Sequence, residues 1–266
     1  VGYFKIPRAW DVAVSGNTAI VAALDSGLIS VDITTPEAPL RMGSYDTVDA
    51  AFAVCLKDEL AIVSNKFGGV LLIDISNPVE LRKVGIIYID GIVVETFFIE
   101  DNLFIADPMN GLHVARIANP ASPRFIGTWR GSTSPCGVYA KDSLVYLYSD
   151  FTGLQILDVS TLNAPVEVCQ INLGYEYTDF MLREYTGYAA VGSRGFAAIE
   201  FSSPTSVSDV EEIDTPGSAF KFVLHGDFAY VADGREGLRV INISDTEAMT
   251  EAGYFDTGGE ARGVFV

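Results

Sequence analysis

Short apolar runs alternate with short polar turns along the whole chain. Residues 51–92 show the pattern, because four runs rich in Val, Ile, Leu and aromatic side chains are bounded there by Gly, Asn, Asp and Pro. The runs are Ala51–Leu56, Leu60–Ser64, Val70–Ile75 and Leu81–Tyr88. Such runs, with turn residues about every 8 to 12 positions, are typical of antiparallel strands, and no segment keeps the apolar period of a helix. We call the four predicted strands a, b, c and d.

The four-strand unit recurs at a constant spacing. A glycine opens strand c in every copy, and successive glycines are 42 residues apart: Gly27, Gly69, Gly111, Gly153, Gly195 and Gly237. A fixed period of this length indicates one supersecondary unit stacked on itself. A single four-stranded sheet cannot bury both of its faces, whereas sheets packed radially about an axis can. The sequence therefore predicts an all-β fold, a β-propeller of four-stranded antiparallel blades, with strand a at the centre and strand d at the outer edge.

The two ends of the chain bear on the number of blades. Val1–Ile6 matches strand d and Arg262–Val266 matches strand a, so these two strands occur once more than b and c. If the native chain runs on by roughly 28 residues, a seventh blade is split between the chain ends; otherwise the propeller has six blades. The repeat arithmetic favours seven. Because repeats bury their faces on one another, we expect residues 1–266 to form a single domain, possibly truncated.

The unit resembles the LVIVD-repeat family, which is named for a motif in strand c. The resemblance is carried by Gly69–Pro78 (GVLLIDISNP), Gly237–Ser244 (GLRVINIS), Val12–Asn17 (VAVSGN) and Phe228–Asp233 (FAYVAD). It covers all six copies, and the copy that begins at Gly195 diverges most. The resemblance implies a propeller from bacterial or archaeal surface or exported proteins, often one module of a larger chain. It implies an extracellular or cell-surface location in a prokaryote and no catalytic motif.

The chain is strongly acidic. Lys and Arg number 17 against 35 Asp and Glu, a formal net charge of −18. This balance repels nucleic acid and anionic membrane surfaces, so we expect no nucleic-acid partner. No run approaches the ~20 consecutive apolar residues that span a bilayer, so we expect no membrane insertion.

The d–a and b–c loops share one rim of a propeller, and loops on a rigid scaffold are where binding concentrates. Exposed aromatic side chains with arginine nearby are typical of protein interfaces. We therefore predict a protein partner or surface assembly at this rim. The candidate residues are Trp10, Phe52, Phe67, Met109, Phe151, Tyr175, Tyr177, Phe220 and Arg235.

Carboxylates recur near the predicted mouth of the axial channel. At the second position of strand a, Asp11, Glu95 and Asp179 occupy the first, third and fifth repeats, and Lys221 occupies the sixth. Oxygen ligands that converge from several directions suit a hard cation, so calcium is a candidate ligand, and no other cofactor is expected. The alternative is a hydrated channel mouth in which Lys221 offsets the acids.

Signatures of catalysis are absent from the sequence. The two histidines, His113 and His225, are expected in strand c and in an a–b turn, and no nucleophile elbow, phosphate loop or dinucleotide fingerprint occurs. A carboxylate pair such as Asp11 with Asp179 leaves a hydrolase or lyase open. The sequence favours a non-catalytic binding or structural propeller at the cell surface or in an extracellular assembly. The alternative is a cation-dependent glycan binder or carboxylate-based enzyme at the channel mouth.

Overall fold

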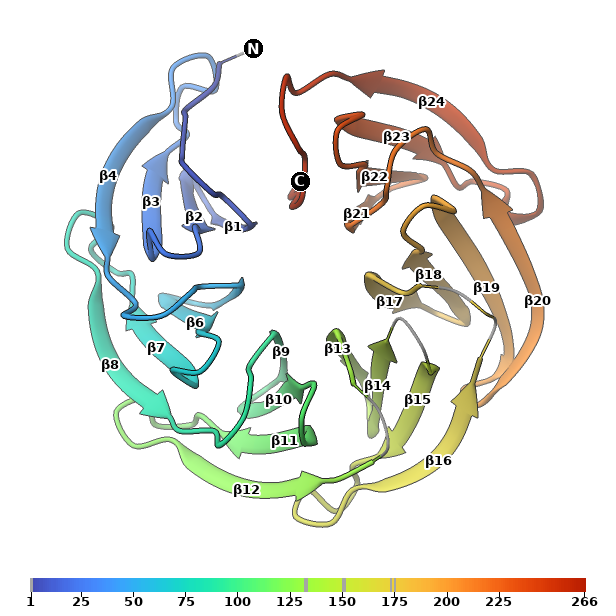
Figure 1. The fold of residues 1–266 in the computed structure, drawn as a ribbon, viewed down its shortest axis with the longest axis horizontal. Helices are drawn as coiled ribbons and strands as arrows, with labels where there is room; N and C mark the ends of the chain where they lie inside the picture. Colours follow the sequence, from blue (N-terminus) through green and yellow to red (C-terminus); the bar gives the residue numbers. More distant parts are fainter. Residues whose placement is uncertain (1, 132–133, 150–151, 173, 175) are drawn as a thin grey trace. The chain divides into compact units, whose positions relative to one another are not determined.

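The structure is a computed structural model, and it describes residues 2–131, 134–149, 152–172, 174 and 176–266. The chain groups into two compact units. Unit 1 comprises Val1–Ser132 and Leu162–Ala164, and unit 2 comprises Thr133–Thr161 and Pro165–Val266. Each unit contains three four-stranded antiparallel sheets (Figure 1). That residues 1–266 form a single domain stays a prediction.

The strands of unit 1 pair in the order in which they follow one another along the chain. The first sheet contains β1 (Asp11–Ser15), β2 (Thr18–Ala22), β3 (Leu28–Asp32) and β4 (Leu40–Tyr45). The second contains β5 (Ala53–Lys57), β6 (Leu60–Ser64), β7 (Val70–Asp74) and β8 (Arg82–Ile87). The third contains β9 (Glu95–Ile99), β10 (Asn102–Asp107), β11 (Gly111–Arg116) and β12 (Arg124–Trp129).

Unit 2 follows the same plan. The fourth sheet contains β13 (Gly137–Lys141), β14 (Leu144–Ser149), β15 (Gly153–Asp158) and β16 (Val166–Ile171). The fifth contains β17 (Asp179–Arg183), β18 (Thr186–Ala190), β19 (Phe196–Ser203) and β20 (Ser206–Ile213). The sixth contains β21 (Lys221–His225), β22 (Phe228–Ala232), β23 (Leu238–Asn242) and β24 (Thr250–Phe255), with the 3-10 turn η1 (Thr246–Ala248) before its last strand. The predicted strands a to d are confirmed in all six repeats.

The six repeated glycines have a shared conformational reason. Each adopts a positive φ between 72° and 89° at the entry to strand c. A Cβ built on Gly69 would lie 2.3 Å from the carbonyl oxygen of Ile87, at the end of strand d of the same sheet. The position therefore excludes a side chain for two reasons, backbone conformation and close approach.

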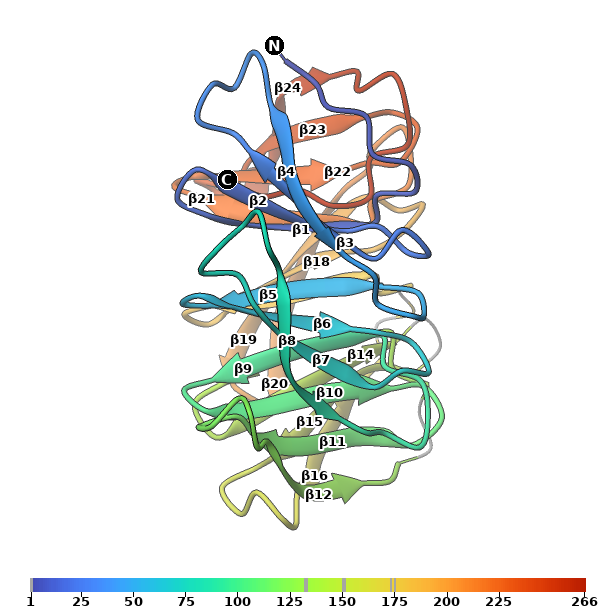
Figure 2. The ribbon, with the colours of Figure 1, turned by 90° about the vertical axis from the view of Figure 1, so that its left-hand side faces the viewer.

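The outer strand of every sheet carries an irregularity, and in the first two sheets a glycine beside it packs against the next repeat. Register shifts interrupt the pairing of strands c and d in all six sheets, for example between Leu72 and Ile73. Directly after this bulge, Gly43 packs on the c–d corner that contains Pro78, and Gly85 packs on the corner that contains Pro120. In Figure 2, β4 and β8 run steeply across the inner strands of their sheets, as strongly twisted sheets require.

The core consists of apolar layers between neighbouring sheets. In unit 1, Ile62 and Leu72 of the second sheet pack with Leu103 and Ile105 of the third. In unit 2, Tyr146 and Tyr148 of the fourth sheet belong to one cluster with the fifth-sheet Phe180. Burial of a sheet's face against the next sheet is the packing that the repeat predicts. Among the described residues, no helix is long and apolar enough to span a membrane.

The two terminal segments differ from the prediction. Residues 2–6 were expected to form a strand d and residues 262–266 a strand a, but neither segment lies in a strand. A strand needs a hydrogen-bonding partner along its length, and no described strand pairs with these segments. Gly2 nevertheless packs on the c–d corner at Glu37, in the way that Gly43 packs on the next corner along the chain.

Candidate binding surface

The strongest candidate surface is a cluster of aromatic side chains in unit 1 around one lysine, which we call the aromatic patch. It consists of Trp10, Phe52, Lys66 and Phe67. Trp10 and Phe52 occupy the same position of the repeat, just before β1 and β5. The backbone N–H groups of both residues continue the ladder to strand b, donating to Ala22 and to Ser64 at 2.8 Å. The backbone of both residues is therefore held by the sheets, and the two ring centroids lie 6.0 Å apart at an interplanar angle of 56°.

Lys66 and Phe67 complete the patch from the turn between β6 and β7. The Lys66 Nζ lies 5.8 Å from the centroid of the Phe52 ring and 5.0 Å from that of Phe67, within cation–π range. The carbonyl of Lys66 accepts a 2.9 Å hydrogen bond from the N–H of Val93, in the segment leading to the third sheet. Phe67 is 61% exposed although it is large and apolar.

A neighbouring loop holds this turn in place. The side chain of Asn65 donates to the carbonyl of Thr47 at 2.9 Å, and the Asp49 carboxylate accepts from the N–H of Phe67 at 3.1 Å. Between these anchors, Val48 is 96% exposed and has a φ of +67°. A positive φ is strained for a β-branched residue, and such strain persists only where the surroundings impose it.

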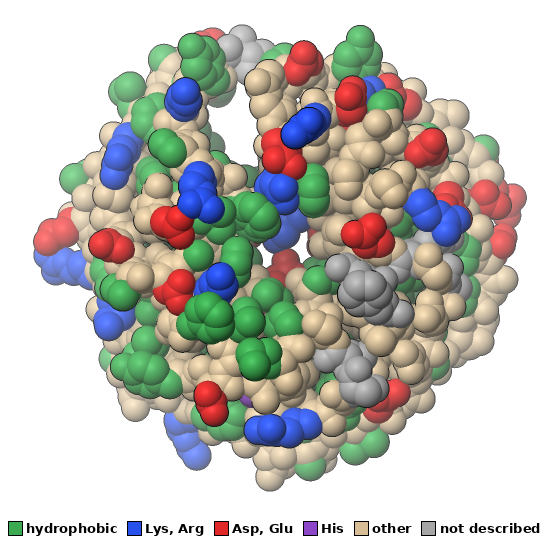
Figure 3. Space-filling view, viewed as in Figure 1, with side chains coloured by type: hydrophobic (Ala, Val, Ile, Leu, Met, Phe, Trp, Pro, Cys, Tyr) green, Lys and Arg blue, Asp and Glu red, His purple; other side chains and the backbone are tan. Residues whose placement is uncertain are grey.

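Figure 3 shows the face that carries the d–a and b–c loops. Hydrophobic side chains gather on it over the inner ends of the first sheets of unit 1, with basic side chains among them. The sequence had identified Trp10, Phe52 and Phe67 but had missed Val48 and Lys66. A signal was present for Val48, because an apolar residue in the acidic loop Asp46–Asp49 has no partner in the strand pattern.

The other predicted rim residues belong to other blades. Met109 is 68% exposed in the b–c turn of the third sheet, and Arg235 is exposed in the corresponding turn of the sixth. Phe220 is half-buried in unit 2, with the guanidinium carbon of Arg262 4.3 Å from its ring centroid. Phe151 and Tyr175 lie outside the described residues.

The expected exposure of Tyr177 is wrong. Its side chain is 0% exposed and belongs to the apolar cluster that contains Tyr148, Leu154 and Phe180. The residue follows the d–a loop, but its ring is covered by two neighbouring sheets of unit 2. It therefore supports the core of that unit and offers nothing to a partner.

Two of the predicted metal ligands have hydrogen-bonding roles within their units. Asp11 is buried, and its Oδ2 accepts a 3.0 Å hydrogen bond from the N–H of Val54 in the next sheet. The half-buried Asp179 does the same in unit 2, where its Oδ2 accepts from the N–H of Phe222 at 3.0 Å. These carboxylates thus stabilise contacts between neighbouring sheets, whether or not they also bind a cation. Glu95 is half-buried.

Calcium binding by these residues stays a prediction. Among the described residues, no group of three or more His, Cys, Asp or Glu side chains is placed to hold a metal ion.

Buried charged groups occur at a position that the sequence analysis did not identify, the end of strand b. Asp107 accepts from the N–H groups of Ile92 and Met109, and its Oδ2 lies 2.9 Å from the Nε2 of His113. His113 in turn contacts the Thr128 hydroxyl at 3.0 Å. Burial favours a raised pKa for Asp107, but these hydrogen bonds and one from Asn110 outweigh it and lower the pKa below its ordinary value.

Asp233 occupies the equivalent position of the sixth sheet, but its pKa is shifted in the opposite direction. It accepts from the Thr215 hydroxyl at 2.6 Å and from the N–H of Gly217 at 2.9 Å. Burial raises the pKa of Asp233 by more than these bonds and the charge of Arg239 lower it. Both carboxylates fix the loop that precedes strand a, so they position the rim. A polar residue in the otherwise apolar strand c, His113 or Arg239, was the available sequence signal.

The comparisons with known proteins agree with this architecture. The chain is similar to the WD40 β-propeller domain of Doa1, with a TM-score of 0.76 and 9% identity over 94% of this chain and 82% of that one. It is similar to the WD40 repeats of RRP9, with a TM-score of 0.75 and 8% identity over 96% and 82% of the two chains. The computationally designed Ika8 protein has a TM-score of 0.70 and 10% identity over 98% and 91%. Identities this low show the fold alone.

The class of the protein follows from these likenesses and from the sheets. The chain is a six-bladed β-propeller in which each blade is a four-stranded antiparallel sheet. The family model of the LVIVD repeat matches residues 8–47, 98–130 and 216–257. The chain therefore contains LVIVD repeats, as its strand c motifs indicate. None of the curated proteins compared with the chain matches it.

Proposed function

We propose that this LVIVD-repeat propeller is a non-catalytic binding module and that the aromatic patch docks a partner protein. The observation that carries the proposal is the cation–π arrangement of Lys66 with Phe52 and the largely exposed Phe67. Aromatic side chains are enriched among the residues that dominate binding energy at protein interfaces. Exposed aromatic side chains placed against a cation are thus suited to contact a second protein.

The patch is preorganised, which favours affinity. Hydrogen bonds hold the backbone of Trp10 and Phe52 in the sheets, and the Asp49 carboxylate holds the backbone of Phe67 through its N–H. Groups that are already ordered lose less conformational freedom when a partner binds. The strained and exposed Val48 beside them is consistent with this role, because stored strain clusters at functional sites.

The carboxylates support this assignment over chemistry at the channel mouth. Asp11 and Asp179 each accept a backbone N–H of the neighbouring sheet, which accounts for their presence without a substrate or cation. We further propose a cell-surface or extracellular setting, which is supported by the resemblance of the repeats and by the net charge of −18.

The test introduces the photoreactive residue benzoylphenylalanine at Phe67 and, in a control variant, at Phe125, which is 51% exposed on β12. Crosslinking is done in the native source of the protein, and the crosslinked protein is identified by mass spectrometry. We expect a discrete partner from position 67 and none from position 125.

The partner is then purified and titrated against a Trp129→Phe background. The chain has two tryptophans, so Trp10 becomes the sole indole reporter within the patch. We expect partner binding to change the Trp10 fluorescence and Phe67→Ala to weaken binding by about tenfold or more, the range of interface anchors. Equal affinities of Phe67→Ala and wild type, with both folded by circular dichroism, would show that the patch is not the docking surface.

A further inference from the structure

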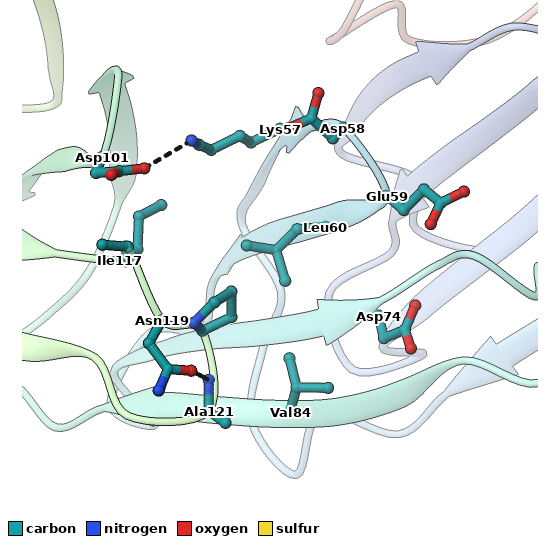
Figure 4. Close-up of a pocket in the computed structure, with 12 residues that line it drawn as sticks. Lys57, Asp58, Glu59, Leu60, Asp74, Val84, Asp101, Ile117, Asn119 and Ala121 are labelled. Atoms are coloured by element: carbon teal, nitrogen blue, oxygen red, sulfur yellow. Dashed lines mark hydrogen bonds and ion pairs between the residues drawn. The ribbon is translucent and has the colours of Figure 1, made fainter.

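A groove lies on the opposite edge of unit 1, where the a–b turns and the c–d corners meet. It has a volume of about 480 Å³, and residues of the second and third sheets line it (Figure 4). Its apolar part consists of Leu60 from β6, Val84 from β8, and Ile117 with Pro120 from the corner after β11. Volumes of this size are typical of sites that hold a small ligand or one large side chain.

Carboxylates stand around this apolar surface. The second sheet contributes Asp58, Glu59 and Asp74, and the third contributes Asp101. The N–H of Ser76 donates to the Asp74 carboxylate at 2.9 Å, and hydrogen bonding by Ser76 lowers the pKa of Asp74, so the group is ionised at neutral pH. Neither Asp58 nor Glu59 has a side-chain hydrogen bond or an ion pair with another described residue.

One basic side chain, Lys57, reaches the groove. Its Nζ lies 2.9 Å from the Oδ1 of Asp101. The equivalent Lys141 of unit 2 also reaches the a–b turn of the next sheet, where it donates to the backbone carbonyl of Glu184 at 3.0 Å. The recurrence shows that Lys57 serves as a bond between neighbouring sheets. It balances Asp101. The charge of Arg82, which is paired with Glu80, acts on Asp74, whereas Asp58 and Glu59 form no ion pair with a described residue.

We propose that this groove binds an arginine side chain carried by a basic peptide segment of a partner protein. The argument is complementarity of charge and polarity. The alkyl stem of arginine fits the apolar surface of Leu60 and Ile117, while its guanidinium reaches the carboxylates at the edge. An anion is repelled there, and a neutral apolar ligand leaves the carboxylates desolvated and unpaired. Guanidinium is also weakly hydrated and matches carboxylate geometry, which favours it over an ammonium group.

The inference does not rest on the function proposed for the aromatic patch, because it concerns other residues on another edge of the blades. It adds a second class of ligand to the module. It also assigns a role to acidic residues of the chain, whereas the aromatic patch contains a basic residue, Lys66, and no acidic one.

The test uses two peptides of the same shape, acetyl-Gly-Arg-Gly-amide and its neutral analogue with citrulline in place of arginine. Each is titrated into isotope-labelled protein, and backbone amide resonances are followed. We expect saturable shifts that are confined to residues 57–60 and 117–121 for the arginine peptide, and binding of the citrulline peptide that is weaker by about fivefold or more.

The matched variants are Asp58→Asn with Glu59→Gln, and Asp142→Asn as the control. Asp58 and Asp142 occupy the same position of the a–b turn, with φ of 53° and 55°, and asparagine tolerates this conformation. The double variant is expected to bind the arginine peptide about threefold to tenfold more weakly, and the control is expected to bind it as the wild type does.

Three results overturn the proposal. The first is equal binding of the two peptides. The second is unchanged affinity of the double variant. The third is a set of shifts centred on the acidic groove of unit 2, lined by Glu200, Asp209 and Glu247, instead of on residues 57–60 and 117–121. Thermal unfolding of each variant checks that the exposed turn substitutions leave the fold intact.

Discussion

The contact between Gly85 and the corner at Pro120 offers a sharp test of how the blades are held together. Gly85 lies on β8 directly after the bulge and pairs with Leu72. A Cβ built on Gly85 would lie 1.9 Å from the carbonyl oxygen of Pro120, whereas real Cβ contacts essentially never fall below 3.0 Å. The substitution Gly85→Ala must therefore move the two sheets apart by more than 1 Å.

The magnitude follows from what this movement disturbs. The obstructing atom belongs to the backbone, so no rotamer change relieves the overlap. The sheets that must separate share the packed layer containing Ile62, Leu72 and Leu103. Overpacking in a close-packed interior costs about 1 to 3 kcal/mol, and we expect a value near the upper end for a rigid contact. The loss is partly offset, by about 0.5 to 1 kcal/mol, because alanine in a strand has less unfolded-state entropy than glycine.

The chain provides a matched control. Gly253 holds the same position in the last strand of the sixth sheet, and a Cβ built there meets no atom within 4 Å. Urea unfolding of the two variants, followed by far-ultraviolet circular dichroism, gives the change in the free energy of unfolding. We expect a loss of about 2 kcal/mol for Gly85→Ala and no loss for Gly253→Ala. Equal stabilities of the two variants would refute the view that the corner fixes the distance between neighbouring blades.

Four further predictions follow from the rim. Val48→Gly relieves the strained φ, so it should raise the free energy of unfolding, measured by urea titration, by about 1 kcal/mol. The same variant should bind the partner more weakly, and a loss of stability contradicts the assignment of strain. Asp107 has a lowered pKa, so its stabilisation is present at neutral pH and is lost as the pH falls below the ordinary range of an Asp carboxyl. Asp107→Asn should therefore cost about 2 kcal/mol near neutral pH and weaken the acid dependence of the melting temperature. Asp233 has a raised pKa, so the free energy of unfolding decreases as the pH rises from the ordinary Asp range to that pKa, and Asp233→Asn should remove this decrease. If the melting temperature changes with pH in the same direction because of both carboxylates, both assignments are contradicted. Millimolar calcium tests the metal prediction, because a bound ion raises the melting temperature of the wild type but not of Asp11→Asn; an unchanged wild-type value removes the prediction.

The sequence predicted the sheets well because strands and turns are encoded locally. Apolar runs, turn residues and a glycine every 42 residues define each blade without reference to its neighbours. The glycines illustrate this, since the positive φ of Gly69 and its contact with Ile87 both lie within one blade. The prediction was weaker at the chain ends, where a strand depends on a partner that the local pattern does not supply.

The candidate surfaces were only partly predictable, because exposure depends on what the next blade covers. Phe67 and Tyr177 were equivalent as rim aromatics in the sequence, yet Phe67 is 61% exposed and Tyr177 is 0% exposed. The role of Asp11 as acceptor of the Val54 N–H likewise depends on a residue 43 positions away. The sequence thus determined the repeat, the four-stranded blade and the likeness to the LVIVD repeat, since these follow from local residue patterns. Only the tertiary structure decided which rings meet, which carboxylates bond the next blade and where a groove opens, because packing between blades places those side chains.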